Sequence, residues 1–166
     1  MSANKALCIG INYHGTEYAL RGCINDADDW AKFLGANGFA PSVLSEAAAT
    51  RKSVLFAMAA LIKSLTPGSV GVITYSGHGT WIPDVSGDEP DGRDEALVPF
   101  DVGDDGTNLI IDDELKALFS DIPKGAKVVF IPDCCHSGTI FRFFGNGTSR
   151  RKVRFLPPAH FLKDGD

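Results

Sequence analysis

Apolar residues along this chain gather in four short segments, each followed by polar residues, glycine or proline. The segments cover residues 5–13, 41–47, 69–77 and 126–134. Apolar-rich segments of this length are typical of strands buried on both faces of a parallel sheet. We therefore expect each of the four to form a strand.

Between these strands, apolar residues recur with the period of an α-helix. Three helices are expected, at residues 25–39, 50–65 and 112–122. Asn25 or Asp26 is the expected N-cap of the first helix, because short polar side chains accept hydrogen bonds from the first turn. Thr50 and Asp112 are the expected N-caps of the other two helices.

Two shorter strands are expected between the third long strand and the third helix. They cover residues 95–101 and 107–115 and are joined by the Asp105-Gly106 turn. Residues beyond Gly138 show no clear period and are predicted to form a loop. The alternation of strand and helix predicts one α/β domain with a mainly parallel sheet flanked by helices on both faces.

Two polar motifs directly follow the third and fourth long strands. "YSGHGT" covers residues 75–80 and "DCCHSG" covers residues 133–138. If these strands are neighbours in the sheet, His78 and Cys135 come together at its carboxyl edge, where ligands and chemistry gather. A thiol attacks as the thiolate, and histidine exchanges protons near neutral pH. Cys135 and His78 are therefore the candidate catalytic pair.

Neighbouring groups supply further candidates and alternatives. The backbone N–H groups of Gly79 and Cys135 are candidate donors to the oxyanion of a tetrahedral intermediate. His136 follows Cys135 directly and competes with His78 as the base, although adjacent side chains point in different directions. His14 follows the first strand, near the same edge. Taken alone, the cysteine motif also fits a small buried cysteine with no chemical role, and the histidine motif also fits a histidine at a turn.

The composition is that of an ordinary globular protein, with 44% hydrophobic and 22% charged residues over 166 positions. No apolar run is long enough to span a membrane and no signal-peptide pattern is present, so a cytoplasmic protein is expected. The four cysteines include no Cys-x-x-Cys pair. They therefore favour thiols over a disulfide framework or a structural zinc site.

Charge is unevenly distributed around a net value of −5. Residues 84–113 contain eleven acids and one base, whereas residues 142–163 contain six bases and no acid. The acidic block is a solvated loop or a cation site, but it does not match an EF-hand. The basic stretch is an ordinary linker, a docking segment for a partner, or a linker that is cleaved. The acidic total disfavours nucleic-acid binding.

The two motifs, together with "LRGCINDA" at residues 20–27, resemble the metacaspases and their bacterial relatives, a group of caspase-like cysteine peptidases. The resemblance runs from about residue 5 to residue 140. It implies a caspase-like three-layer sandwich and the hydrolysis of peptide bonds after arginine or lysine. We therefore expect a catalytic domain at residues 1–140 and a basic loop or linker at residues 141–166.

The resemblance also assigns roles to individual residues. It makes Cys135, rather than Cys134, the nucleophile and His78 its partner. The residues that it implies for an acidic substrate pocket are Asp26, Asp133, Cys23 and Ser76. Two carboxylates beside the nucleophile suit a cationic side chain and repel an acidic one.

Many metacaspases are activated by calcium, and the resemblance implies Asp94, Asp112 and Asp113 as possible ligands. The fourth ligand position falls on Arg142, whose positive charge opposes a cation. Asp112 and Asp113 also fit ordinary roles in the first turn of a helix. Calcium is thus a possible cofactor, and no other cofactor is required.

The expected function is a cysteine endopeptidase acting on peptides or proteins with a basic residue before the scissile bond. Relatives continue into a smaller segment that completes the sheet and the substrate groove, so this segment or a second chain is an expected partner. The stretch "SRRKVR" at residues 149–154 suits self-cleavage. The alternatives are a caspase-fold interaction module without turnover, a calcium-sensing domain built on residues 84–113, and a thiol-redox protein.

Overall fold

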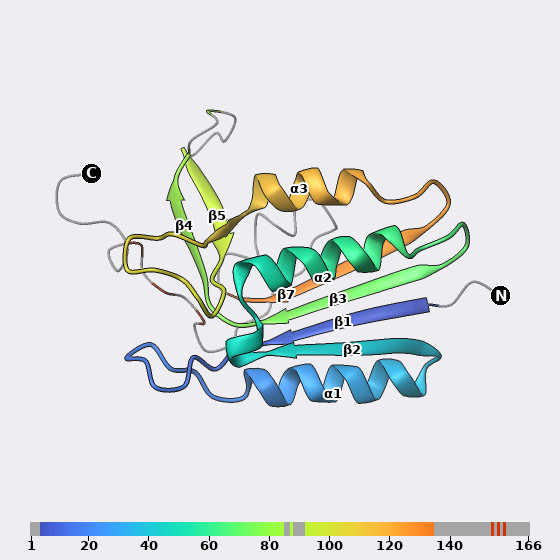
Figure 1. The fold of residues 1–166 in the computed structure, drawn as a ribbon, viewed down its shortest axis with the longest axis horizontal. Helices are drawn as coiled ribbons and strands as arrows, with labels where there is room; N and C mark the ends of the chain where they lie inside the picture. Colours follow the sequence, from blue (N-terminus) through green and yellow to red (C-terminus); the bar gives the residue numbers. More distant parts are fainter. Residues whose placement is uncertain are drawn as a thin grey trace.

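A parallel sheet forms the centre of the computed structural model, which describes residues 4–84, 87, 92–134, 154, 156 and 158. The strands lie in the order β2-β1-β3-β7 and are all parallel (Figure 1). Their bounds are β1 Asn4–Gly10, β2 Phe39–Ser45, β3 Val70–Ser76 and β7 Lys127–Asp133. The four long strands expected from the sequence are confirmed.

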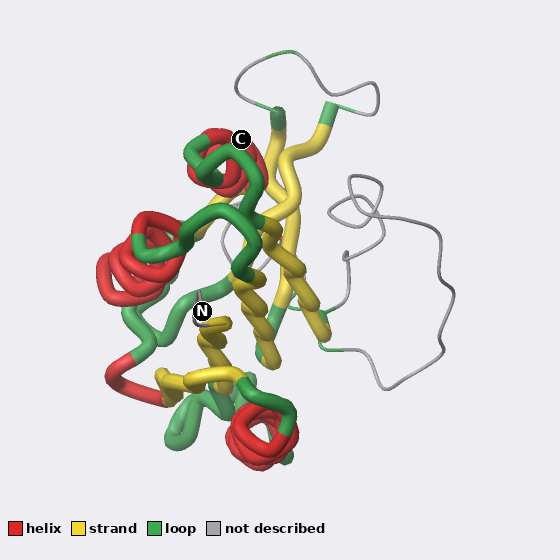
Figure 2. The backbone as a smooth tube through the Cα atoms, turned by 90° about the vertical axis from the view of Figure 1, so that its right-hand side faces the viewer, coloured by secondary structure: helices red, strands yellow, loops and turns green. Residues whose placement is uncertain are grey.

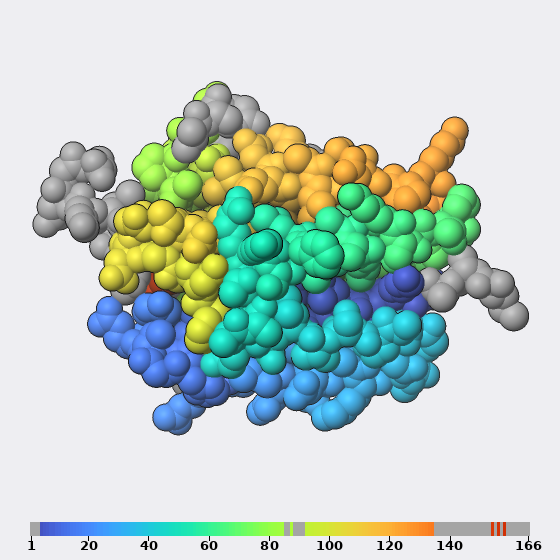
Figure 3. All heavy atoms as spheres, in the orientation of Figure 1, coloured from blue at the N-terminus to red at the C-terminus, as the bar shows by residue number. Residues whose placement is uncertain are grey.

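Helices cover both faces of this sheet, as the alternation of elements predicted. α1 (Cys23–Ala36) lies on one face, and α2 (Arg51–Lys63) and α3 (Asp112–Ser120) lie on the other (Figure 2). In the space-filling view, α2 and α3 form the surface over the sheet (Figure 3). No helix in the described ranges is long and apolar enough to cross a membrane.

Alternate residues of the central strands fill two separate cores. In β1, Leu7 and Ile9 pack into the larger core beneath α2 and α3, whereas Ala6 and Cys8 pack into the smaller core beneath α1. Successive side chains of a strand point to opposite faces, so a strand buried on both faces is apolar along its whole length. This is why these strands could be recognised in the sequence.

α1 begins two residues earlier than expected. Its N-cap is Gly22, at a φ of 98°, so Asn25 and Asp26 lie inside the first turn and the expected cap is wrong. The Asn12 side chain, from the loop after β1, accepts the Cys23 N–H at 2.9 Å and replaces a local cap. The Asp26 carboxylate therefore does not cap the helix and can contact groups outside it.

The other two expected N-caps have different outcomes. Thr50 caps α2, because its hydroxyl accepts the Ser53 N–H at 3.2 Å. Asp112 is instead the first residue of α3, whose N-cap is Ile111. The Glu114 carboxylate accepts the Ile111 N–H at 3.3 Å, so the side chain that serves this end comes from within the helix.

A second, three-stranded antiparallel sheet has the order β4-β5-β6. Its strands are β4 Gly79–Pro83, β5 Arg93–Leu97 and β6 Ile110–Ile111. β4 was not expected, because its five residues carry no clear alternation. The expected strands at 95–101 and 107–115 are shorter than predicted, since residues 99–109 form turns and α3 begins at Asp112.

Candidate active site

The two motifs meet at the carboxyl edge of the parallel sheet. β3 and β7 are neighbours, and their last residues, Ser76 and Asp133, are directly paired. β3 leads within two residues to His78, and β7 leads to the buried Cys134. Cys135 and His136 lie outside the described residues, so the described part of the site is the part around His78.

The backbone of His78 is held by two buried tyrosines. Its N–H donates to the Tyr13 hydroxyl at 3.0 Å, and its carbonyl accepts the Tyr75 hydroxyl at 2.9 Å. The Tyr13 hydroxyl in turn donates to the Val98 carbonyl at 2.5 Å. Burial raises the pKa of both tyrosines, so both hydroxyls stay protonated and can act as donors.

Gly77 is required by these tyrosines. A Cβ at this position comes within 2.8 Å of the Tyr75 hydroxyl oxygen and 3.0 Å of the Tyr13 hydroxyl oxygen. Any larger residue therefore displaces the two groups that hold His78. The glycine before the histidine thus has a packing role.

The imidazole ring of His78 is oriented by a backbone carbonyl. Its Nε2 lies 2.7 Å from the carbonyl oxygen of Tyr18, and the side chain is buried beside the Tyr13 ring, with 4.9 Å between centroids. A carbonyl oxygen only accepts, so Nε2 carries the proton. Nδ1 is then the nitrogen that can take a proton from, or return one to, a reacting group.

An arginine of this chain lies between the two carboxylates expected to form the substrate pocket. Arg154 Nη2 is 2.5 Å from Asp26 Oδ2, and Nη1 is 2.9 Å from Asp133 Oδ2. Nη1 also donates to the Asp133 carbonyl at 3.3 Å. α1 supplies one carboxylate and β7 the other, so this pocket exists only when the chain is folded.

Cys23 and Ser76, the other two residues that the resemblance implies for this pocket, carry no charge. Cys23 and Ser76 are both buried. Burial raises the pKa of the Cys23 thiol to about 11, while the Arg154 charge acts in the opposite direction. Burial alone lowers the pKa of Arg154, but the hydrogen bond to Asp26 and the nearby charges raise it overall. The pocket therefore holds a cationic guanidinium against two carboxylates and an uncharged thiol.

Gly79 also binds the backbone at Arg154 and Leu156 through two hydrogen bonds. The Gly79 N–H donates to the Arg154 carbonyl at 3.0 Å, and the Leu156 N–H donates to the Gly79 carbonyl at 3.1 Å. Gly79 is the residue expected to supply an oxyanion donor. The N–H expected to bind a substrate carbonyl thus binds the carbonyl of the residue whose side chain fills the acidic pocket.

A hollow of about 330 Å³ adjoins the acidic pocket. Asp26 and Asp133 line it together with Asp29, Trp30 and Phe33, which follow along α1. The Phe33 side chain is exposed. The surface next to the pocket therefore combines negative charge with aromatic rings.

The expected calcium ligands are not assembled into a metal site in the described structure. Asp94 is buried in β5, whereas Asp112 and Asp113 begin α3. Within the described ranges, no group of three or more His, Cys, Asp or Glu side chains could hold a metal ion. Arg142 lies outside the described residues. Calcium binding is therefore still a prediction from the resemblance alone.

The His14 side chain contacts Glu46. The His14 Nδ1 is 2.7 Å from Glu46 Oε1, and its side chain is 66% exposed, so it belongs to a different set of contacts. The described cysteines, Cys8, Cys23 and Cys134, form no disulfide.

Sequence reasoning missed the residues that hold His78. Tyr13 and Tyr75 each come after an apolar run, and a buried tyrosine needs a partner for its hydroxyl, which is the signal that could have indicated them. The Tyr18 carbonyl is a backbone group, so no side chain marks it. Arg154 was noticed only as one base within a cleavable stretch.

The sheet, its covering helices and this edge define a caspase-like α/β protein. A crystal structure of a Geobacter sulfurreducens protein superposes with a TM-score of 0.76 at 35% identity, covering 96% of this chain and 60% of that one. The chain belongs to the metacaspase family, because the model of the metacaspase peptidase C14 domain matches residues 4–143.

Curated relatives agree with this assignment. The chain is 41% identical over 145 residues to metacaspase-1 of Cryptococcus neoformans, covering 81% of this chain and 32% of the relative. It is 40% identical over 144 residues to metacaspase-4 of Arabidopsis thaliana, covering 81% of this chain and 33% of the relative. The chain thus spans about a third of the length of these relatives.

Proposed function

We propose that this protein is a cysteine endopeptidase that cleaves peptide bonds after arginine or lysine. The main observation that supports the proposal is the position of Arg154. Its guanidinium lies between Asp26 and Asp133, and its carbonyl accepts the Gly79 N–H beside His78. A substrate arginine bound in the same way has its scissile carbonyl next to the catalytic histidine.

The proposed chemistry proceeds through a thioester. The Cys135 thiolate attacks the carbonyl carbon, and the Gly79 N–H stabilises the oxyanion, together with the Cys135 N–H. The C–N bond then breaks, and the protonated Nδ1 of His78 gives its proton to the leaving amine. Water, deprotonated by His78, attacks the thioester carbon, and the C–S bond breaks to release the acid and the thiolate. The proton first lost by Cys135 goes to His78 or to water.

Specificity follows from the charges of the pocket. Two carboxylates next to a neutral thiol and a neutral hydroxyl attract a guanidinium or an ammonium group. The fork of an arginine matches both carboxylates at once, whereas a lysine makes a single point contact. An acidic side chain meets two like charges and is rejected. The pocket therefore favours arginine, then lysine, over aspartate.

The bond between Arg154 and Phe155 is the proposed site of self-cleavage. The stretch at residues 149–154 contains three other basic residues, each followed by a peptide bond, but the contacts described above single out Arg154 as the base in the acidic pocket. We expect the purified chain to yield a fragment that starts at Phe155, detected by intact mass and N-terminal sequencing. The Arg154→Gln variant is expected to lose this fragment, because a neutral amide does not pair with two carboxylates.

Arg151→Gln is the matched control for self-cleavage, since it removes a neighbouring charge from the same stretch. It is expected to keep the cut after Arg154. Cys135→Ala is expected to stay intact. Cleavage that occurs only after other basic residues and is unchanged in Arg154→Gln contradicts this assignment.

The proposed partner is a further segment or second chain that adds to the sheet at β7. Among the described strands, β7 has a neighbour on one side only, and its Val129 is 45% exposed. An open strand edge with an exposed apolar side chain favours pairing with another strand. This arrangement supports a strand added next to β7.

Calcium activation is a further expectation of the resemblance, and the mechanism above contains no metal step. If it applies, added calcium raises turnover of an arginine peptide, a chelator lowers it, and Asp113→Asn removes the response, because carboxylate oxygens are the ligands that calcium prefers. The measurement is kcat against free calcium in the two proteins. Turnover that is the same with calcium and with chelator contradicts calcium dependence.

A further inference from the structure

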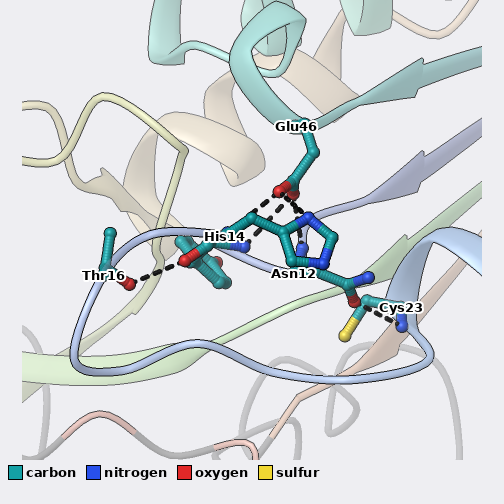
Figure 4. A network of polar contacts seen from close by, with 6 residues as sticks. Asn12, His14, Thr16, Cys23 and Glu46 are labelled. Carbon is teal, nitrogen blue, oxygen red and sulfur yellow. Dashed lines mark hydrogen bonds and ion pairs between the residues drawn. The ribbon is translucent and has the colours of Figure 1, made fainter.

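Three successive backbone N–H groups of the loop after β1 point at one carboxylate. Asn12 and Tyr13 donate to Glu46 Oε2 at 2.6 and 3.1 Å, and His14 donates to Glu46 Oε1 at 3.0 Å. Figure 4 shows the Glu46 side chain reaching down to Asn12 and His14 from the short 3-10 helix η1 (Glu46–Ala48), which directly follows β2. Consecutive N–H groups that converge in this way form an anion-binding nest. In this protein, its own glutamate fills the nest.

Both sides of this contact have an unfavourable backbone conformation. Tyr13 has a φ of 54° and Glu46 a φ of 46°, in the left-handed region that L-residues with side chains rarely adopt. Such conformations cost of order 1–3 kcal/mol each and persist where the surroundings enforce them, often at functional sites. Two such residues in direct contact therefore mark the nest as a candidate functional feature.

The charge of Glu46 suits the nest. Partial burial alone raises the pKa of Glu46, but hydrogen bonds from the N–H groups of His14, Asn12 and Tyr13 lower it, so the net shift is downward. A carboxylate with a lowered pKa adds stability above its ordinary pKa, and this stability is lost as the pH falls through the lowered value. Near neutral pH, Glu46 is therefore the anion that the nest requires.

The loop that Glu46 holds is the one that positions the catalytic histidine. Tyr13, the middle residue of the nest, accepts the His78 N–H through its hydroxyl at 3.0 Å. Asn12 closes the loop, because its carbonyl accepts the Leu20 N–H at 2.7 Å. Within the closed loop, the Tyr18 carbonyl lies 2.7 Å from His78 Nε2. Both the backbone and the ring of His78 are thus held by the segment that begins at the nest.

The same loop fixes the start of α1. Figure 4 shows the Asn12 side chain contacting Cys23, whose N–H it accepts at 2.9 Å. Cys23 is the first residue of α1, and Asp26 lies in the first turn of that helix. The nest loop is thus linked to the helix that supplies one carboxylate of the substrate pocket, but α1 is also held independently, because Ala27 and Leu34 pack in the core against β1.

We propose that Glu46 is a positioning residue of the active site, whose carboxylate occupies a backbone nest and thereby sets the orientation of His78. The proposal rests on the proposed peptidase function for its kinetic readout. It has one distinctive consequence. Because the nest is made of backbone N–H groups, it survives removal of the glutamate side chain and can bind a small carboxylate from solution.

The test is chemical rescue of Glu46→Gly by formate. Glycine adopts a φ of 46° without strain, so this variant empties the nest and keeps the backbone. With an arginine peptide as substrate, kcat is expected to fall about 10- to 100-fold, since hydrogen bonds to a charged acceptor are lost. KM is expected to change less than about threefold. Sodium formate near 50 mM is expected to recover most of the lost kcat, whereas sodium chloride at the same ionic strength is not.

Glu46→Gln and Thr50→Ala are the companion variants. Glutamine keeps one neutral acceptor, so a smaller loss of kcat than in Glu46→Gly is expected, without formate rescue. Thr50→Ala removes the N-cap of α2, which lies four residues away along the chain and whose side chain bonds to Ser53 within that helix. It is expected to lower the unfolding temperature and leave kcat unchanged. Wild-type kcat in Glu46→Gly, or a loss that formate does not restore, overturns the proposal.

Two readouts do not depend on turnover and separate this proposal from the peptidase assignment. Formate is expected to raise the unfolding temperature of Glu46→Gly and not that of the wild type. The ¹⁵N signals of the His78 ring are expected to show a proton on Nε2 in the wild type and in the formate-loaded variant, and a mixture of tautomers in the empty variant. If the wild type is inactive but both effects are observed, the proposed peptidase function is wrong and the proposed role of Glu46 stands. If the ring signals of His78 are the same in the wild type and the empty variant, the proposed role of Glu46 is wrong.

Discussion

Replacement of His78 by alanine is expected to lower kcat for an arginine peptide by about 10²- to 10⁴-fold, the range typical of lost general acid–base catalysis. The ring has its Nε2 proton committed to the Tyr18 carbonyl, so in the proposed mechanism Nδ1 is the nitrogen that gives a proton to the leaving amine. Without it, the amine must leave unprotonated or take its proton from water. The measurement is steady-state hydrolysis of a fluorogenic peptide by the wild type and the variant.

The fold is expected to tolerate this change. The contacts from His78 to Tyr13 and Tyr75 use its backbone N–H and carbonyl, which alanine retains. We therefore expect the unfolding temperature to shift by no more than about 4 °C, which corresponds to ~1 kcal/mol in a domain of this size. The double variant with Cys135→Ala is expected to be no less active than Cys135→Ala alone, because the two groups act as a unit. A kcat within tenfold of the wild type in His78→Ala contradicts the role of this residue.

The second large effect is expected from the acidic pocket. Asp26→Asn and Asp133→Asn are each expected to lower kcat/KM for arginine peptides about 10- to 100-fold, less than for a fully buried pair because both carboxylates are partly exposed. The double variant is expected to lose more than either single one. Both substitutions keep the size and shape of the side chain, so the loss measures charge.

The substrate provides the internal control for the pocket. A peptide with glutamine in place of arginine before the scissile bond has no charge to pair, so its slow hydrolysis is expected to change less than about threefold in either variant. Asp29→Asn is the matched protein control. Asp29 is one turn further along α1 and lines the adjacent hollow, but it makes no ion pair with Arg154. An equal loss in Asp29→Asn, or unchanged arginine cleavage in Asp133→Asn, contradicts the pocket.

The parallel sheet could be predicted because its evidence is local. Strands such as β1 and β3 are buried on both faces, so the sequence itself is apolar along each of them. The start of α1 could not be predicted, because its cap comes from Asn12 in another loop. β4 was missed since a strand of five residues is stabilised mainly by its partner β5, which follows only after nine intervening residues.

The motif that contains His78 could be recognised in the sequence, but the residues that hold His78 could not. His78 stands in a recognisable motif at a strand end, and the neighbouring strand ends at Asp133. Tyr13 and Glu46 are 65 and 32 residues from His78, and nothing local connects them with it. Arg154 is 128 residues from Asp26, and only folding distinguishes it from the other bases of its stretch. Contacts of this kind depend on tertiary structure, which motif reading does not supply.

The central claim is that a thiol at Cys135 hydrolyses peptide bonds after a basic residue. The most direct test is hydrolysis of fluorogenic tetrapeptides that differ only in having arginine, lysine, glutamine or aspartate before the reporter, with calcium and with chelator, beside Cys135→Ala. We expect kcat/KM to fall in the order arginine, lysine, glutamine, aspartate, and all turnover to vanish in Cys135→Ala. Hydrolysis that persists in Cys135→Ala, a preference for aspartate, or no hydrolysis of any peptide by the folded protein under either condition would contradict the account.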